Sequence, residues 1–181
     1  LAGIAAPTNY TRSLDLETGV SRVTFTSGDT LYQQETFAPY SRPHLLVHRV
    51  IADKPGAVSC EIRFSTQHKD SRCAIAPDGR LTVSGWVQTN GVQFEVQCVV
   101  RAVGKGAKRT EAGERLTVTG ADSVEIIWTA ATNVKAWDKL GGDPAKACLD
   151  ALKSVSRKSF SDLLADHVAA YQALFKRVEL N

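Results

Sequence analysis

The sequence predicts a mainly β protein, with an antiparallel β-sandwich over residues 1–140 and a helical linker over residues 141–181. Short segments in which apolar and polar residues alternate recur as far as residue 133, and turn-forming residues separate them. The pattern changes to helical spacing after Gly141 and Gly142. Alternation with a period of two is typical of strands that bury one face, and many such strands favour two packed antiparallel sheets.

The bulk composition excludes several classes of protein. The chain has 181 residues, of which 43% are hydrophobic and 23% charged, enough for one globular domain with its own core. No apolar run approaches the roughly 18 residues that a membrane span needs. The net charge of +3 is too small, and the basic residues too scattered, for a nucleic-acid surface. The chain contains no Met, so we expect that its natural beginning is not included.

The predicted strands follow one another in a regular order. Segments 21–26 and 60–64 alternate, and segment 45–51 is apolar on both phases, as expected for a strand covered on both sides. Segment 92–100, "VQFEVQCVV", is the clearest strand, and 123–132 is the last. We expect three carboxylates on solvated strand faces: Glu61, Glu95 and Glu125. Turns are predicted at Ser27-Gly28-Asp29, Lys54-Pro55-Gly56, Pro77-Asp78-Gly79, Asn90-Gly91 and Gly120-Ala121-Asp122.

Two helices are predicted after the strands. Asp143 as the N-cap and Pro144 at the first helical position begin a helix that reaches about Lys153. The second begins near Ser159, which forms a capping-box pair with Asp162 in place of the usual Glu. One wide apolar stripe runs along it: Phe160, Leu163, Leu164, His167, Val168, Tyr171, Leu174, Phe175 and Val178. A stripe this wide needs a neighbour, and we expect part of it to be exposed in this chain alone.

Neither a metal site nor a catalytic constellation stands out. His44 and His48 are four residues apart, but in a strand that spacing separates them by about 13 Å, too far for one zinc ion. His167 is expected to be a packed and hydrogen-bonded core residue. Nucleophile elbows, phosphate-binding loops and a spaced pair of glycosidase carboxylates are absent. We therefore expect no catalytic residue, no metal ion and no cofactor.

The four cysteines leave two interpretations open. Cys60 and Cys98 fall on the apolar phases of their strands, where buried free thiols and a Cys60–Cys98 disulfide are both compatible with the pattern. Among the tryptophans, Trp128 is expected in the core. Trp86 and Trp137 are possible sugar platforms, because carbohydrates bind on aromatic faces.

Several motifs occur together in one order along nearly the whole chain. They are "YTRSLDLETGVSRVTFTSGDTLYQQETFA", "LLVHRVIADKPGAVS", "GVQFEVQ", "GADSVEIIWTAATN", "GGDP" and "SFSDLLADHVAAYQALFKRVELN". In this order they resemble the N-terminal β-sandwich and linker helix of glycoside hydrolase family 95. Val134 stands where the family usually has Tyr or Phe, Gln34 lies where an Arg is common, and residues 69–76 match nothing. The family's β-domain begins well before Leu1, so we expect its first strands to be missing.

The resemblance implies a function for a larger protein. Members of that family are mostly inverting α-L-fucosidases, whose catalytic Glu and Asn/Asp residues lie in an (α/α)6 barrel after the linker. The expected partners are this downstream barrel, introduced by the final "VELN", and fucosylated glycans outside the cell or in the periplasm. Trp137 and Asn133 become the candidate substrate-binding residues, because loops between a sheet and a helix often carry function.

Three alternatives remain open at this point. The chain is compatible with an independent carbohydrate-binding sandwich that uses Trp86 or Trp137. It is also compatible with a dimerisation module that uses the helix stripe. Finally, other glycosidases with an (α/α)6 barrel, including phosphorylases, carry a similar sandwich joined by helices.

Overall fold

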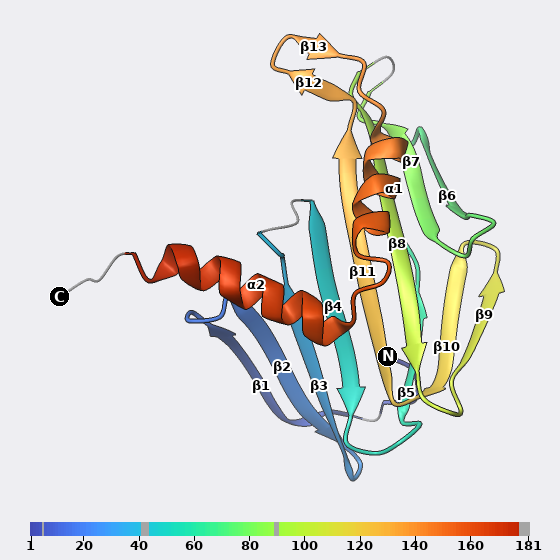
Figure 1. Cartoon of the computed structure of the whole chain (residues 1–181). Coiled ribbons are helices and arrows are strands. Elements are labelled where there is room, and N and C mark those ends of the chain that lie inside the picture. The colour runs from blue at the N-terminus through green and yellow to red at the C-terminus, as the bar shows by residue number, and fades with distance from the viewer. Residues whose placement is uncertain (5, 41–43, 89–90, 178–181) are drawn as a thin grey trace.

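The computed structural model describes residues 1–4, 6–40, 44–88 and 91–177. Within them, thirteen strands precede two helices, as the sequence predicts (Figure 1). Glycines with positive φ lie in the predicted turns, at Gly28, Gly56, Gly79 and Gly120. Two predictions involve residues outside the described ranges: Asn90 of the Asn90-Gly91 turn and the terminal segment "VELN", which begins with Val178 of the helix stripe.

Eight strands form one large antiparallel sheet in the order β1-β2-β3-β4-β11-β8-β7-β6. Strand β11 is central, because Ile127 lies opposite both Val47 of β4 and Val99 of β8. The bounds are β1 (Thr8–Asp15), β2 (Val20–Ser27), β3 (Thr30–Phe37), β4 (Leu45–Ala52), β6 (Ser71–Ile75), β7 (Leu81–Trp86), β8 (Gln93–Val103) and β11 (Ser123–Thr132).

A three-stranded sheet covers part of one face of the large sheet. It has the order β5-β10-β9, with β5 (Val58–Ile62), β9 (Lys108–Ala112) and β10 (Arg115–Ala121). The core between the two layers is built from alternating strand residues, as predicted: Val50, Val58, Cys60, Leu81, Cys98, Val100, Leu116, Val118, Ala121 and Val124. Trp128 packs against this core. The predicted β-sandwich is therefore confirmed.

The two helices cover the opposite face of the large sheet. Helices α1 (Pro144–Ser154) and α2 (Phe160–Phe175) close a second core. Its buried residues are Val20, Phe37, Leu45, Val47, Ile127, Leu152, Val155, Phe160 and Leu163. Strands β4, β8 and β11 therefore have both faces covered. The expectation that Glu95 and Glu125 lie on solvated strand faces is wrong, because both residues lie on the face of the large sheet that the helices cover. Glu61 is exposed, as expected.

The helix starts follow the predicted capping chemistry. The Oδ1 atom of Asp143 accepts a hydrogen bond from the backbone N–H of Lys146 at 2.9 Å. Ser159 Oγ accepts from the N–H of Asp162 at 3.1 Å, and Asp162 Oδ2 accepts from the N–H of Ser159 at 3.1 Å. Both caps satisfy N–H groups that the first helical turn leaves free, so each fixes where its helix begins. Within the described residues, neither helix has the length and apolar character needed to cross a bilayer.

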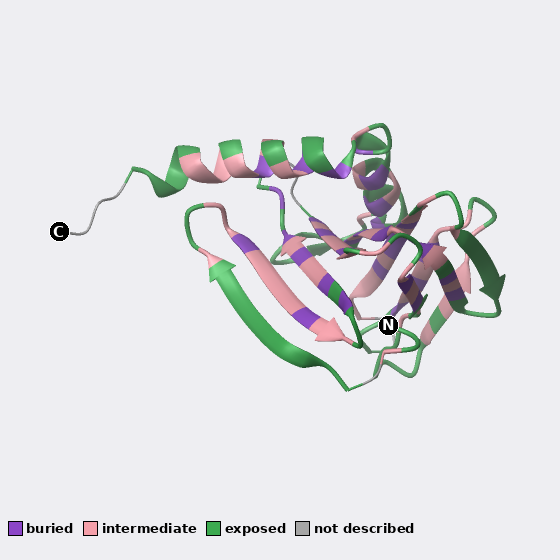
Figure 2. Ribbon diagram, turned by 90° about the horizontal axis from the view of Figure 1, so that it is seen from below, coloured by how far each residue is buried: buried purple, intermediate pink, exposed green. Residues whose placement is uncertain are grey.

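Helix α2 extends across the sheet towards the turn between β1 and β2, and its last turns project beyond it (Figures 1 and 2). Phe160 and Leu163 are buried, and the hydroxyl of Tyr171 donates to the carbonyl oxygen of Leu16 at 2.9 Å. Leu174 and Phe175 remain 39% and 43% exposed. The expectation that part of the apolar stripe is exposed is therefore confirmed.

His167 lies in the middle of the α2 stripe. It is 3% exposed and its ring stacks on Phe37 with a centroid distance of 5.0 Å. The prediction of a packed histidine is confirmed. The predicted hydrogen bond is wrong, because neither ring nitrogen has a partner among the described residues.

The cysteines are free thiols. Cys60, Cys73, Cys98 and Cys148 form no disulfide, which decides between the two interpretations in favour of free thiols. Burial raises the pKa of the Cys98 thiol to about 12 and that of Cys148 to about 11. These thiols pack as small apolar side chains and are poor nucleophiles.

Candidate functional site

The candidate residues Trp137 and Asn133 lie at the end of the sandwich where β11 gives way to a short hairpin. Strands β12 (Val134–Ala136) and β13 (Lys139–Leu140) form this hairpin, which projects from the body of the protein (Figure 1). Trp137 lies in its turn and is 96% exposed. An indole so fully exposed is available for contact with a ligand or a neighbouring domain.

Asn133 has a different position, at the base of the hairpin. It is 7% exposed, and its Oδ1 atom accepts a hydrogen bond from the N–H of Gln93 at 3.0 Å. Its own N–H donates to the carbonyl of Gln93 at 3.0 Å, and its carbonyl accepts from Gly142 at 2.8 Å. These bonds join β11, β8 and the segment before α1. Asn133 thus holds the hairpin in place, whereas Trp137 is presented to the surroundings.

A cavity of about 560 Å³ lies beside the base of the hairpin. It is lined by His44, Phe94, Glu95, Val96, Ala130, Ala131, Thr132, Val134 and Ala147. The register explains where it forms. The last described pair between β4 and β11 is Leu45 with Thr129, but β11 continues to Thr132. Ala130 to Thr132 therefore pair with β8 alone among the described residues, and the cavity lies beside them.

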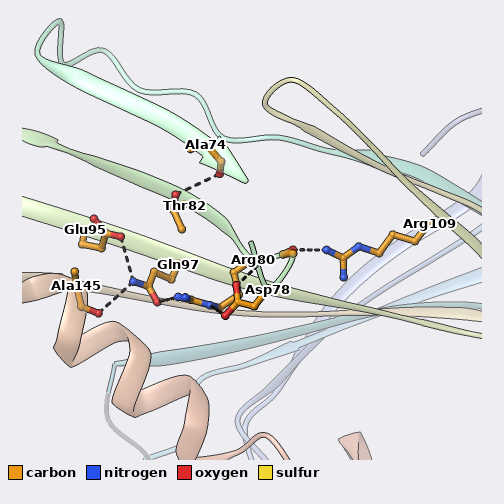
Figure 3. A network of polar contacts seen from close by, with 9 residues as sticks. Ala74, Asp78, Arg80, Thr82, Glu95, Gln97, Arg109 and Ala145 are labelled. Atoms are coloured by element: carbon orange, nitrogen blue, oxygen red, sulfur yellow. Dashed lines mark hydrogen bonds and ion pairs between the residues drawn. The ribbon is translucent and has the colours of Figure 1, made fainter. Parts of the chain in front are cut away.

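Glu95 is the buried acid of this region and belongs to a polar network (Figure 3). Its Oε1 atom accepts from Nε2 of Gln97 at 3.1 Å, and the same amide donates to the carbonyl of Ala145 in α1 at 3.1 Å. Oε1 of Gln97 accepts from Arg80, whose Nε lies 2.7 Å from Oδ2 of Asp78. Burial raises the pKa of the Glu95 carboxyl. The network ties β8 and the turn before β7 to the start of α1.

The remaining sequence candidates lie apart from one another. His44 lies at the cavity with a φ of +71°, whereas Nδ1 of His48 lies 2.8 Å from Oγ1 of Thr36 within the sheet. Trp86 ends β7 on the far side of β8 from β11, partly exposed. Among the described residues, no group of three or more His, Cys, Asp or Glu side chains could hold a metal ion.

The sequence profile described as "Glycosyl hydrolase family 65, N-terminal domain" matches residues 2–137. The chain belongs to this family. The expectation of an N-terminal accessory domain of a glycoside hydrolase is therefore confirmed. The matched profile ends at the turn that carries Trp137, so it covers the sandwich and stops before α1 and α2.

Two known proteins are similar to this N-terminal domain. Alpha-L-fucosidase 2 of Arabidopsis thaliana is 31% identical, over 96% of this chain and 23% of its own length. A putative kojibiose phosphorylase from the human microbiome shares the fold, with a TM-score of 0.61 and 13% identity over 96% of this chain and 26% of its own. The chain thus spans about a quarter of each of these proteins.

Proposed function

We propose that this chain is the accessory N-terminal domain of an inverting α-L-fucosidase that removes terminal fucose from glycans outside the cell or in the periplasm. The observation that carries the proposal is the 31% identity to a plant α-L-fucosidase over 96% of this chain. In this arrangement the described residues supply no catalytic group. They position the catalytic (α/α)6 barrel and border its substrate entrance.

The exposed end of α2 supports a neighbouring barrel. Leu174 and Phe175 lie on the apolar stripe and are only partly covered. Full burial of such side chains contributes roughly 1.5–3 kcal/mol each, so covering the remaining two fifths contributes about 1 kcal/mol each. Since α2 is the last described element, a barrel docked on this stripe would be joined directly to the helix that it covers.

The unequal layers support additional strands in the parent protein. The three-stranded sheet packs over β4, β7, β8 and β11, whereas β1 to β3 contribute nothing to that core among the described residues. Strand β1 is exposed along nearly its whole length (Figure 2), and its residues Tyr10 and Leu14 are among the exposed apolar side chains. We infer that further strands of the parent protein complete the second layer over β1, β2 and β3.

The hairpin supplies the contact with substrate in this proposal. Trp137 would reach the mouth of the barrel, where its indole face contacts the glycan next to the fucose that is cleaved. Asn133 would act by holding the hairpin, as its bonds to Gln93 and Gly142 indicate. Removing the indole should therefore weaken productive binding and leave the chemical step unchanged.

The test is hydrolysis of 2′-fucosyllactose by the parent protein that includes the downstream sequence. We expect fucose release with inversion, and a Trp137→Ala variant whose KM rises about three- to tenfold, the loss of about 1 kcal/mol of binding. Lys135→Ala, on the same hairpin, is the matched control. Sugar release that requires inorganic phosphate would instead make the parent a phosphorylase, and an inert parent would contradict the proposal.

A further inference from the structure

The cavity beside the hairpin has the composition of a small-molecule site that neither similarity explains. Its volume of about 560 Å³ falls within the roughly 300–1,000 Å³ of such sites. Of the nine described residues that line it, six are apolar: Phe94, Val96, Ala130, Ala131, Val134 and Ala147. The polar ones are His44, Glu95 and Thr132. An apolar wall with a few polar groups favours a ligand that has both an apolar face and hydrogen-bonding groups.

Glu95 lines this cavity with unused hydrogen-bonding capacity. It is 8% exposed, and the one described hydrogen bond to its carboxylate comes from Gln97. A carboxylate has about four acceptor positions. The charge of Arg80 opposes the rise in the pKa of Glu95, but among the described residues Arg80 forms its ion pair with Asp78. A buried carboxylate in this state is stabilised by additional donors, such as ligand hydroxyl groups.

His44 contributes a second polar group at a strained backbone position. Its φ of +71° is in the left-handed region, where a side chain other than glycine is strained. Such strain is concentrated at ligand sites, where the surrounding structure holds a side chain in place. His44 immediately precedes β4, the strand whose start leaves room for the cavity.

The lining excludes several other ligand classes. Among the described residues that line the cavity there is no Lys or Arg, so these residues offer an anionic phosphate or carboxylate no cation. The described residues offer no three-ligand metal site. A neutral molecule with several hydroxyl groups and one apolar patch remains the best match to an apolar wall with a carboxylate and an imidazole.

We propose that this cavity is a non-catalytic carbohydrate subsite that holds one neutral sugar unit, with Glu95 accepting hydrogen bonds from its hydroxyl groups. The choice of L-fucose rests on the proposed function, since its methyl group would pack on the alanine and valine wall. His44 and Thr132 provide further hydrogen-bonding groups. The subsite would hold a second branch of the glycan while the barrel cleaves another.

The experiment is a titration of the ¹⁵N-labelled 181-residue chain with L-fucose, followed by amide chemical shifts. We expect saturable shifts at Glu95, Ala131 and Val134, and at least a tenfold weaker affinity in Glu95→Gln, which exchanges an ionic acceptor for a neutral one. The control is Glu61→Gln, at the exposed position of β5, which should bind like the wild type. The dispersion of the amide spectrum of each variant shows that it is folded.

Each outcome separates this inference from the proposed function. Shifts confined to Trp137 and its neighbours, equal binding by Glu95→Gln, or no shift at 100 mM sugar would overturn the subsite. None of these outcomes bears on the proposed fucosidase activity, which is tested by hydrolysis with the parent protein. Saturable shifts at the same amides with D-glucose but not with L-fucose would support a sugar subsite and contradict fucose as its ligand.

Discussion

Arg101 of β8 fastens the linker helices to the sandwich, and its removal gives the sharpest stability prediction. Its guanidinium donates to the carbonyl oxygens of Lys158 at 2.7 Å, Val155 at 3.1 Å and Ser156 at 3.2 Å. All three lie in the turn between α1 and α2. Nη1 also lies 3.6 Å from a carboxylate oxygen of Glu125, whose side chain is largely buried. The side chain of Arg101 therefore hydrogen-bonds three carbonyl groups of the turn and also pairs with the buried carboxylate of Glu125.

The magnitude follows from these contacts. A hydrogen bond from a charged group contributes about 1.5–3 kcal/mol, so three would contribute at most about 4.5–9 kcal/mol. The carbonyl of Ser156 lies in an exposed turn and regains water when Arg101 is removed, and the side chain of Arg101 is itself a quarter exposed. Both facts reduce the loss by about half. We expect Arg101→Ala to lower the free energy of unfolding by about 2–4 kcal/mol.

Urea unfolding followed by circular dichroism measures this loss. Arg101→Lys keeps the charge next to Glu125 but cannot reach three carbonyl groups, so it should fall between the wild type and Arg101→Ala. Arg157→Ala, in the same turn and exposed, should stay within about 0.5 kcal/mol of the wild type. A loss of unfolding free energy below 1 kcal/mol for Arg101→Ala, or one no larger than that of Arg157→Ala, would show that Arg101 does not hold the turn between the helices on the sandwich.

Three further predictions concern the core, the buried acid and the thiols. Leu163→Ala, at a fully buried position of α2, should cost about 2–5 kcal/mol in urea unfolding, whereas Leu174→Ala should cost under 1 kcal/mol because that residue is partly exposed. Burial raises the pKa of the Glu95 carboxyl in the folded protein. The contribution of Glu95 to the free energy of unfolding is therefore fully present below its unfolded-state pKa of about 4.3, and it is lost as the pH rises through the raised pKa of the folded state. Glu95→Gln should therefore gain unfolding free energy over the wild type at pH 7 but not at pH 3.5; an equal difference at both would contradict this. In native protein at pH 8, Cys73 should react with a thiol reagent well before Cys148, and equal rates would show that Cys148 is accessible.

The local features of the fold could be predicted from the sequence because they depend on neighbouring residues. The alternation in segment 92–100 placed Cys98 and Val100 in the core, and Ser159 with Asp162 fixed the start of α2. The width of the α2 stripe indicated that the helix needs a neighbour, and the resemblance to a protein with a following barrel predicted that part of the stripe is exposed in this chain. Each of these features is set by spacing or by capping within a few residues.

The environment of Glu95 and the cavity could not be predicted in the same way. Whether a polar strand face meets water depends on α1, which follows about fifty residues later and lies over β8. The cavity depends on the register that makes Leu45 the first described partner of β11. Neither relation has a local sequence signal. In the sequence, His44 stands out only for its spacing from His48, because its left-handed backbone conformation has no local sequence signal.

Fucose release by the parent protein, compared with that by the 181-residue chain alone, tests the central claim most directly. The proposal predicts that the parent, with its downstream sequence, releases fucose from 2′-fucosyllactose and that the isolated chain at the same concentration releases none above background. Fucose release by the isolated chain would contradict the claim, because it would place catalytic groups in the sandwich or its linker helices. A parent whose downstream sequence encodes no barrel would contradict it equally.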